Sequence, residues 1–198
     1  NMAMGDKSQL AYWMNVGSAV SSGLTILFLF WSITALGRKI FLGNANHTTS
    51  LTSTQTIVVM GAGLVGALAY AFSDTFWFSA VESEVYAMSS LCTAVVFWAI
   101  LKWEVRADEE GADRWLIFIA YVMGLSIGVH LLNLLVIPAI ALVIYFRKTK
   151  QVTKGGALKA FLLGVVVLGF ILWGVIQFLI KFAAFTDLFF VNTLGLGF

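Results

Sequence analysis

The apolar stretch WLIFIAYVMGLSIGVHLLNLLVIPAIALVIYF, from Trp115 to Phe146, decides how this chain crosses a membrane. It is about 30 residues long, whereas one helical span needs about 20. It fits either one long tilted helix or two short helices broken near the segment Gly124–Gly128 and His130. The choice determines on which side of the membrane the basic loop that follows will lie.

The distribution of Lys and Arg favours the broken pair. Short cytoplasmic loops carry an excess of these residues. With two helices in the stretch, residues 38–55, 102–114 and 147–160 share one side and hold ten of the twelve Lys and Arg residues. With one helix, the most basic of these loops would move to the other side. We therefore expect six apolar segments with the N-terminus outside, and Pro138 within the second short helix, because transmembrane helices tolerate proline.

Composition places the chain among membrane proteins. Hydrophobic residues make up 60%, charged residues 11%, and the mean hydropathy is +0.93, whereas soluble domains contain about 45–50% apolar residues. We predict an all-α integral membrane protein with a single transmembrane domain over residues 1–198, and we expect the chain to be a piece of a longer protein. The predicted spans are about 12–37, 56–73, 76–101, 115–129, 131–146 and 160–180, followed by a tail at 181–198 that is outer or re-entrant.

One glycine pattern invites a functional interpretation that its surroundings exclude. The segment Thr56–Gly66 contains the G-x-G-x-x-G spacing of dinucleotide-binding folds. Such a fold also needs alternating strands and helices, whereas the neighbouring segments have membrane length and composition. The small residues in the pattern favour close helix contacts instead. The predicted contact pairs are Ala62 with Gly66 and Gly63 with Ala67.

Polar residues near the predicted non-cytoplasmic ends form the candidate site, because ionisable residues in or beside a span are functional candidates by default. Its members are Asp74, Glu82, Glu84, Tyr86, His130 and Asn133. On a continuous helix over 76–101, one face is polar. That face contains Ser79, Glu82, Ser83, Tyr86, Ser89, Ser90 and Thr93. Glu84 then lies about 200° from Glu82, so the two can share a site only if the helix starts late or Glu84 meets a second element.

Each candidate also has a purely structural interpretation. Asp74 can cap the helix that follows it. The serine and threonine face can serve helix packing, and Glu82 and Glu84 can form a buried pair without a ligand. His130 and Asn133 can satisfy backbone groups at the helix break. These alternatives remain open at the level of sequence.

Three stretches carry a family resemblance: TFWFSAVESEVYA (Thr75–Ala87), AYVMGLSIGVHLLN (Ala120–Asn133) with Pro138, and LFFVNTLGL (Leu188–Leu196). They resemble the multi-span, protein O-mannosyltransferase-like family of Bacteroidota and its animal relatives, which belongs to the GT-C class of membrane glycosyltransferases. The resemblance covers nearly the whole chain. It implies a partial GT-C-like transmembrane bundle.

The resemblance also implies a chemistry. The family is expected to transfer a sugar from a polyprenyl-phosphate donor to a hydroxyl acceptor, on a protein or another molecule, at the non-cytoplasmic side; in a bacterium this is the periplasmic face of the inner membrane. Such transfer needs a carboxylate that deprotonates the acceptor and polar groups that stabilise the departing phosphate. The predicted catalytic residues are Glu82 and Glu84, and the predicted substrate-binding residues are Asp74, Tyr86, His130 and Asn133. The family's expected catalytic acid lies in a first outer loop that precedes this sequence, so we expect the chain by itself to be incomplete for catalysis.

The remaining expectations concern ligands and rival functions. No cofactor is predicted; two carboxylates and a histidine could hold a divalent metal ion, but we expect none, and Cys92 is interpreted as an apolar filler. The expected partners are membrane lipid, the lipid-linked sugar and the acceptor, without nucleic acid. A transporter or channel subunit would also use broken helices and buried carboxylates, and a non-catalytic membrane scaffold is the other rival. A glycosyltransferase should show a lateral groove beside Glu82 and His130, a transporter should show a path through the bundle, and a scaffold should show neither.

Overall fold

The computed structural model describes residues 9–43 and 50–195, and within these ranges it contains helices and no strand. The all-α prediction is therefore confirmed for the part of the chain that is described. Contacts divide the chain into two compact units, Asn1–Leu134 and Leu135–Phe198. The assignment of a single transmembrane domain to residues 1–198 stays a prediction.

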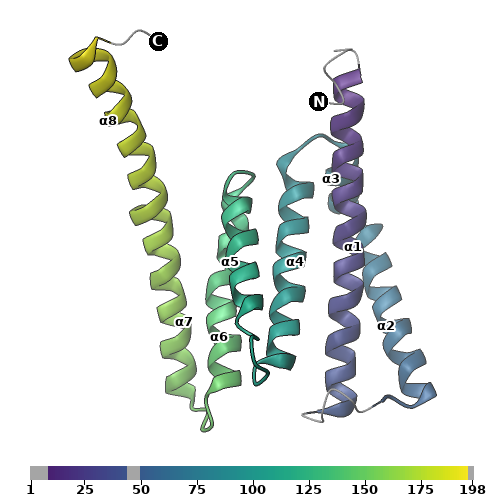
Figure 1. The fold of residues 1–198 in the computed structure, drawn as a ribbon. Helices are drawn as coiled ribbons and strands as arrows, with labels where there is room; N and C mark the ends of the chain where they lie inside the picture. Colours follow the sequence, from purple (N-terminus) through teal and green to yellow (C-terminus); the bar gives the residue numbers. More distant parts are fainter. Residues whose placement is uncertain (1–8, 44–49, 196–198) are drawn as a thin grey trace. The chain divides into compact units, whose positions relative to one another are not determined.

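The first unit is built around its first helix. Its helices are α1 (Leu10–Leu42), α2 (Ser53–Ala71), α3 (Asp74–Val81), α4 (Val85–Arg106) and α5 (Arg114–Ile127). Helix α1 packs against α2, α3 and α4, and α4 packs in turn against α5 (Figure 1). Helix α1 is thus the axis on which the other elements of this unit are arranged.

Helices α1 and α4 run in the same direction. Early in both helices, the Ser21 hydroxyl lies 3.9 Å from the sulfur of Met88. Late in both helices, Lys39 forms an ion pair with Glu104. The ends of α1 and α4 therefore meet at one end of the unit, which we call the charged end, while the end of α2, the start of α4 and the end of α5 lie at the opposite end.

An aromatic cluster lies near the charged end. The ring centroids of Phe28 and Trp98 are 5.3 Å apart, and those of Trp98 and Trp115 are 5.6 Å apart. The Lys102 ammonium lies 5.5 Å from the Trp98 ring centroid, within the range of a cation–π contact. Tryptophan and lysine of this kind are typical of the level of lipid headgroups, so we expect the cluster to lie near one membrane surface.

Helix α2 meets α1 through small residues. Gly63 and Ala67 are buried, whereas Ala62 is exposed. The predicted pair Gly63 and Ala67 is therefore confirmed as an interface, and Ala62 is not part of it. The whole G-x-G-x-x-G pattern lies inside a helix, which removes the strand and turn that a dinucleotide site requires.

Replacing Gly63 by alanine is expected to destabilise the α1–α2 contact. The added methyl carbon would lie 2.7 Å from Thr34 Cγ2 and 3.0 Å from a ring carbon of Phe30. Because both neighbours are side-chain atoms that can rotate, we expect a modest loss of about 1 kcal/mol in the free energy of unfolding. Denaturant unfolding of the purified protein would measure it. Gly61→Ala is the matched control, because its added carbon would meet nothing within 4 Å; equal losses in both variants would contradict the assignment.

The third predicted span is wrong as a continuous helix. Helix α3 ends at Val81 and α4 begins at Val85, so Glu82, Ser83 and Glu84 form a link instead of a helical turn. Glu82 and Glu84 have extended backbones, and the Glu84 amide donates to the Glu82 carbonyl at 2.9 Å. The three residues are exposed and polar, so water can satisfy backbone groups that a helix would otherwise pair. The continuous polar face predicted for 76–101 therefore does not exist.

The predicted break in the Trp115–Phe146 stretch is confirmed. Helix α5 ends at Ile127, and after three residues a 3₁₀ helix, η2 (Leu131–Val136), leads into α6 (Ile137–Lys148). Pro138 lies in the first turn of α6, where its missing amide hydrogen would have had no helical partner. The break thus falls at Gly128–His130, as the charge distribution indicated.

In the second unit, α6 forms a hairpin with α7 (Lys154–Gly169). The two helices approach closely where Gly164 faces Pro138 and Ala141. At the tip, the Thr153 amide donates to the Tyr145 hydroxyl at 3.2 Å. Thr153 also caps α7, since its side-chain oxygen accepts from the Gly156 amide at 3.0 Å. The hairpin tip is therefore held by its own hydrogen bonds.

Helix α7 continues without interruption through a π-helical segment, η3 (Phe170–Ile176), into α8 (Gln177–Leu194). The helix therefore continues past residue 180, and Lys181 lies inside α8; the end of the membrane span near residue 180 stays a prediction. A single lysine leaves the backbone hydrogen bonds intact, and its long side chain can extend toward a polar surface. Residues 196–198 of the predicted tail lie outside the described residues, and its outer or re-entrant position stays a prediction.

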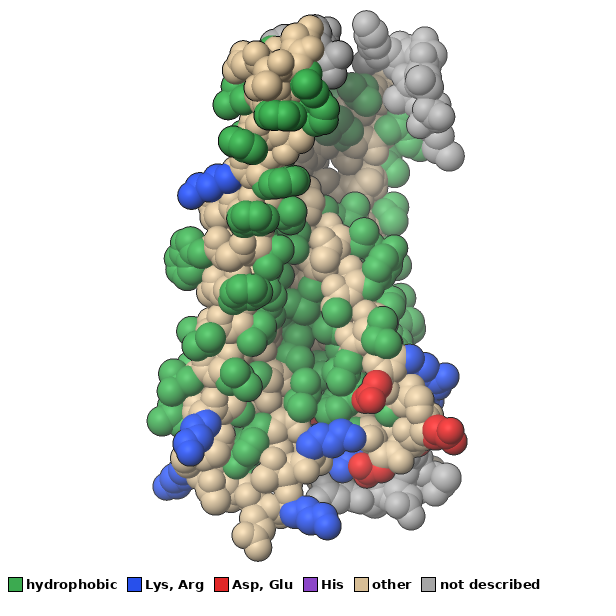
Figure 2. All heavy atoms as spheres, turned by 60° about the vertical axis from the view of Figure 1, so that its left-hand side comes forward, with side chains coloured by type: hydrophobic (Ala, Val, Ile, Leu, Met, Phe, Trp, Pro, Cys, Tyr) green, Lys and Arg blue, Asp and Glu red, His purple; other side chains and the backbone are tan. Residues whose placement is uncertain are grey.

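Five helical stretches are long and apolar enough to cross a membrane. They are Leu10–Leu42, Ser53–Ala71, Val85–Arg106, Leu131–Lys148 and Lys154–Leu194, with Arg114–Ile127 as a shorter apolar helix. Figure 2 shows apolar side chains along most of the visible helical surface. In water such a surface would be unfavourable, whereas lipid solvates it. The chain is an integral membrane protein.

Candidate functional site

Two of the predicted site residues meet at the end of the first unit opposite the charged end. Tyr86 lies in the first turn of α4, and His130 lies in the link after α5. Their ring centroids are 5.7 Å apart with an interplanar angle of 48°. Tyr86 is exposed and His130 is partly buried. This contact joins two stretches that are far apart in the sequence, and it defines the centre of the candidate site.

The backbone fixes the orientation of His130. Its amide donates to the Ser126 carbonyl at 2.8 Å, and its ring nitrogen Nδ1 accepts a hydrogen bond from the Leu132 amide at 3.1 Å. A neutral imidazole that accepts at Nδ1 carries its proton on Nε2. His130 therefore does satisfy a backbone group at the helix break. The same bond leaves Nε2–H as a donor that can serve a ligand.

Asn133 supports this link from inside the protein. Its side chain is fully buried, and its amide nitrogen donates to the Ser126 hydroxyl at 2.9 Å. The Ser126 hydroxyl donates in turn to the Met123 carbonyl at 2.7 Å. The Asn133 carbonyl oxygen has no hydrogen-bond partner among the described residues. Asn133 thus ties the start of η2 to the end of α5, and a direct contact between Asn133 and a substrate stays a prediction.

Ser126 is the residue of this site that sequence reasoning missed. It is fully buried and connects Asn133 to the last turns of α5. It lies in the Gly124–Gly128 segment, which the sequence marked as the break but not as a partner of Asn133. A hydrogen bond between residues seven apart across a helix break has no periodic signature.

The two candidate carboxylates lie in the link between α3 and α4. Glu82 is the residue after α3, and Glu84 is the residue before α4, two positions from Tyr86. Both side chains are exposed, and neither forms a buried pair. Helix α4 does start late, at Val85, which was one of the two conditions for Glu82 and Glu84 to share a site. Because Glu82 and Glu84 lie outside both helices, they are not held on different faces of one helix.

Asp74 lies at the start of α3, apart from the Tyr86–His130 contact. Helix α3 begins at Asp74 itself, and Ser73 occupies the position before the helix, so the prediction that Asp74 caps the helix is wrong by one residue. Its carboxylate is exposed in the first turn, where it interacts favourably with the helix dipole. No contact joins Asp74 to Tyr86 or His130 among the interactions of the described residues.

The serine and threonine residues of α4 serve the helix itself. Ser89 is buried, and its hydroxyl has no hydrogen-bond partner in the described part of the chain. Thr93 donates its hydroxyl to the Ser89 carbonyl at 3.0 Å, which is a bond within one helix turn. These contacts agree with the packing interpretation. Within residues 9–43 and 50–195, no three or more His, Cys, Asp or Glu side chains gather as a metal site would require.

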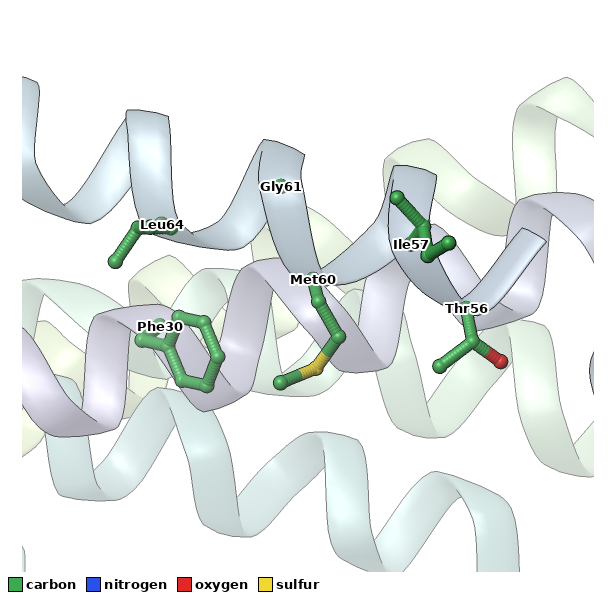
Figure 3. A pocket seen from close by; sticks show the side chains of 6 residues that line it. All are labelled: Phe30, Thr56, Ile57, Met60, Gly61 and Leu64. Atoms are coloured by element: carbon green, nitrogen blue, oxygen red, sulfur yellow. The ribbon is translucent and has the colours of Figure 1, made fainter. Parts of the chain in front are cut away.

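Two shallow apolar grooves lie between α1 and α2, away from the Tyr86–His130 contact. The larger, of about 420 Å³, is lined by Phe30, Thr56, Ile57, Met60, Gly61 and Leu64 (Figure 3). The second, of about 340 Å³, shares Phe30 and Leu64 with the first. Neither groove is lined by a residue of the candidate site. Their walls are apolar, as expected for surfaces that face lipid chains.

The fold and the site together define a polytopic helical membrane protein with a polar cluster at the end opposite its charged end. The chain belongs to the family described as Protein O-mannosyl-transferase TMEM260 N-terminal domain, whose family model matches residues 1–153. The match includes every residue of the candidate site, and it confirms the resemblance to O-mannosyltransferase-like proteins. No curated protein and no solved structure matches the chain.

Proposed function

We propose that this chain forms part of a GT-C-class glycosyltransferase that moves a sugar from a polyprenyl-phosphate donor to a hydroxyl acceptor on a protein or another molecule. The reaction takes place on the non-cytoplasmic side, which is the periplasmic face of the inner membrane if the source is bacterial. Membership in an O-mannosyl-transferase family supports the reaction class. The observation that carries the site assignment is the contact between Tyr86 and His130.

The charge distribution supports the proposed side of the membrane. In the first unit, the loops that follow α1 and α4 lie at the charged end, as the ion pair between Lys39 and Glu104 indicates. The Tyr86–His130 contact lies at the other end of α4. Because short basic loops stay in the cytoplasm, this arrangement supports a site on the opposite face.

In the proposed reaction, the link between α3 and α4 and the link after α5 have different roles. The acceptor oxygen forms a bond to the anomeric carbon while the bond from that carbon to the donor phosphate oxygen breaks, and the electron pair leaves with the phosphate. The acceptor proton passes to a carboxylate acting as general base. His130 Nε2–H donates to the departing phosphate, Glu84 orients the acceptor or a neighbouring helix, and Glu82 forms part of the surface that receives the substrate. Asp74 and Tyr86 complete the proposed substrate-binding surface.

A transfer assay on the full-length protein, with a polyprenyl-linked sugar, tests this assignment. Glu84→Gln keeps the size of the side chain and removes its charge, so we expect the acceptor to be held less well and kcat/KM to fall about 100-fold. Glu82→Gln is expected to have a smaller effect of the same sign. Glu110→Gln is the matched control, because Glu110 is an exposed carboxylate in the loop after α4. Full activity in both Glu82→Gln and Glu84→Gln would rule out the site assignment and leave a scaffold role for this end of the first unit.

A further inference from the structure

The tip of the α6–α7 hairpin is the most unevenly charged surface of the second unit. Between Arg147 and Lys159 the sequence contains five Lys and Arg residues and no Asp or Glu. The side chains of Lys150, Lys154 and Lys159 are exposed. We call these three residues the hairpin lysines.

The segment that covers the end of α4, the loop after it and the start of α5 provides an internal comparison. Residues 102–114 contain three Lys and Arg residues but five Asp and Glu residues. Arg106 lies 4.0 Å from Glu109 there, so positive charge is offset within the loop. Membrane orientation alone explains basic residues in both segments, but it does not explain why carboxylates offset them in residues 102–114 while the hairpin tip has none.

No carboxylate of the second unit can reach the hairpin lysines. Its acidic residue is Asp187, which lies in α8. Lys159 and Asp187 belong to the same uninterrupted helical run, and 28 residues at 1.5 Å per residue separate them by about 42 Å. The negative charge that balances the hairpin lysines must therefore come from outside this unit.

The geometry of the hairpin places these lysines at a membrane surface. The tip joins two stretches that are each long and apolar enough to cross a membrane. Lys150 and Lys154 lie within the tip or at its edge, while Lys159 lies one turn inside α7, next to Leu158 and close to Phe161, which are both exposed. A lysine at that depth extends its ammonium toward the headgroup phosphates. Figure 2 shows Lys and Arg side chains at this end of the visible apolar surface.

We infer that the hairpin tip is a binding surface for anionic phospholipid headgroups. Clusters of four to eight basic residues beside a transmembrane helix attract anionic lipid electrostatically. The hydrogen bonds between Tyr145 and Thr153 and the Thr153 cap hold the tip in place, so the lysines are presented without ordering a flexible loop. The surface recognises negative charge at the headgroup and not the identity of the acyl chain.

Lipid selectivity of the full-length protein in nanodiscs tests the inference. Spin-labelled phosphatidylglycerol and phosphatidylcholine report how strongly each lipid associates with the protein. We expect a preference for phosphatidylglycerol that falls at least about fivefold, the effect of one such lysine, in the triple variant Lys150→Gln, Lys154→Gln, Lys159→Gln. Raised salt should weaken the preference in the unmodified protein, since the contact is electrostatic.

Two matched triple variants serve as controls for this experiment. Replacing the same three lysines by arginine keeps the charge and should keep the preference. Replacing Lys102, Arg106 and Arg114 by glutamine removes the same charge from the adjoining ends of α4 and α5 and should leave the preference nearly unchanged. An unchanged preference in the Lys→Gln triple, an equal fall in the α4–α5 triple, or a fall in the arginine triple would each overturn the inference.

Discussion

His130→Ala is expected to lower kcat/KM for sugar transfer roughly 1,000-fold, the upper range for losing one donor that stabilises developing negative charge. The ring is held by the hydrogen bond from the Leu132 amide to Nδ1. That bond leaves Nε2–H available for the departing phosphate. The measurement is the transfer assay on the full-length protein, with unfolding followed in parallel.

His130→Asn separates the donor role from a structural one. The asparagine carbonyl oxygen can replace Nδ1 as acceptor for the Leu132 amide, because a short polar side chain commonly bonds a backbone amide two residues on. We expect this variant to unfold like the unmodified protein while activity stays low. Activity near the original level in His130→Asn would mean that His130 only supports the link. Tyr86→Phe is a useful companion, since it keeps the ring contact and removes the hydroxyl.

Gly164→Ala is expected to destabilise the second unit by about 3 kcal/mol. The added carbon would lie 2.6 Å from the Pro138 Cα and 3.1 Å from the Ala141 Cβ. Pro138 Cα is a backbone atom, so no side-chain rotation can relieve the contact and α6 must move away from α7. Denaturant unfolding of the purified protein in detergent would measure the loss.

Gly155→Ala is the control within the same helix. Its added carbon would meet nothing within 4 Å, and alanine is the better helix former by up to about 1 kcal/mol. We expect Gly155→Ala to be neutral or stabilising. Similar unfolding midpoints for the two variants would show that the close approach at Gly164 contributes little to stability.

The sequence predicted the helical membrane class and the break at Gly128–His130 for a common physical reason. Both depend on the avoidance of charge in lipid, which shapes composition and the distribution of Lys and Arg along the whole chain. The break at Glu82–Glu84 depends on a local competition instead. Apolar residues continue on both sides of it, and no glycine or proline interrupts them, so helical periodicity favoured one continuous helix.

The candidate site, too, could be predicted from the sequence only in part. Its location at one end followed from topology, but the Nδ1 bond of His130 and the pairing of Asn133 with Ser126 arise only once the chain is folded. The sequence indicates that Glu82 and Glu84 can share a site if the helix starts late, but it does not predict that the helix starts at Val85. The roles of the individual residues remain predictions for the assays above.

The shortness of α5 has a consequence for depth in the bilayer. Its 14 residues rise about 21 Å, whereas the hydrocarbon core is about 30 Å thick. Trp115, near the start of α5, lies in the aromatic cluster, which we expect at one headgroup level. We therefore expect hydrophobic mismatch at the other end: the bilayer thins around His130, or the ring lies recessed below the lipid surface. In either case a substrate carried on a lipid would meet this histidine without leaving the membrane.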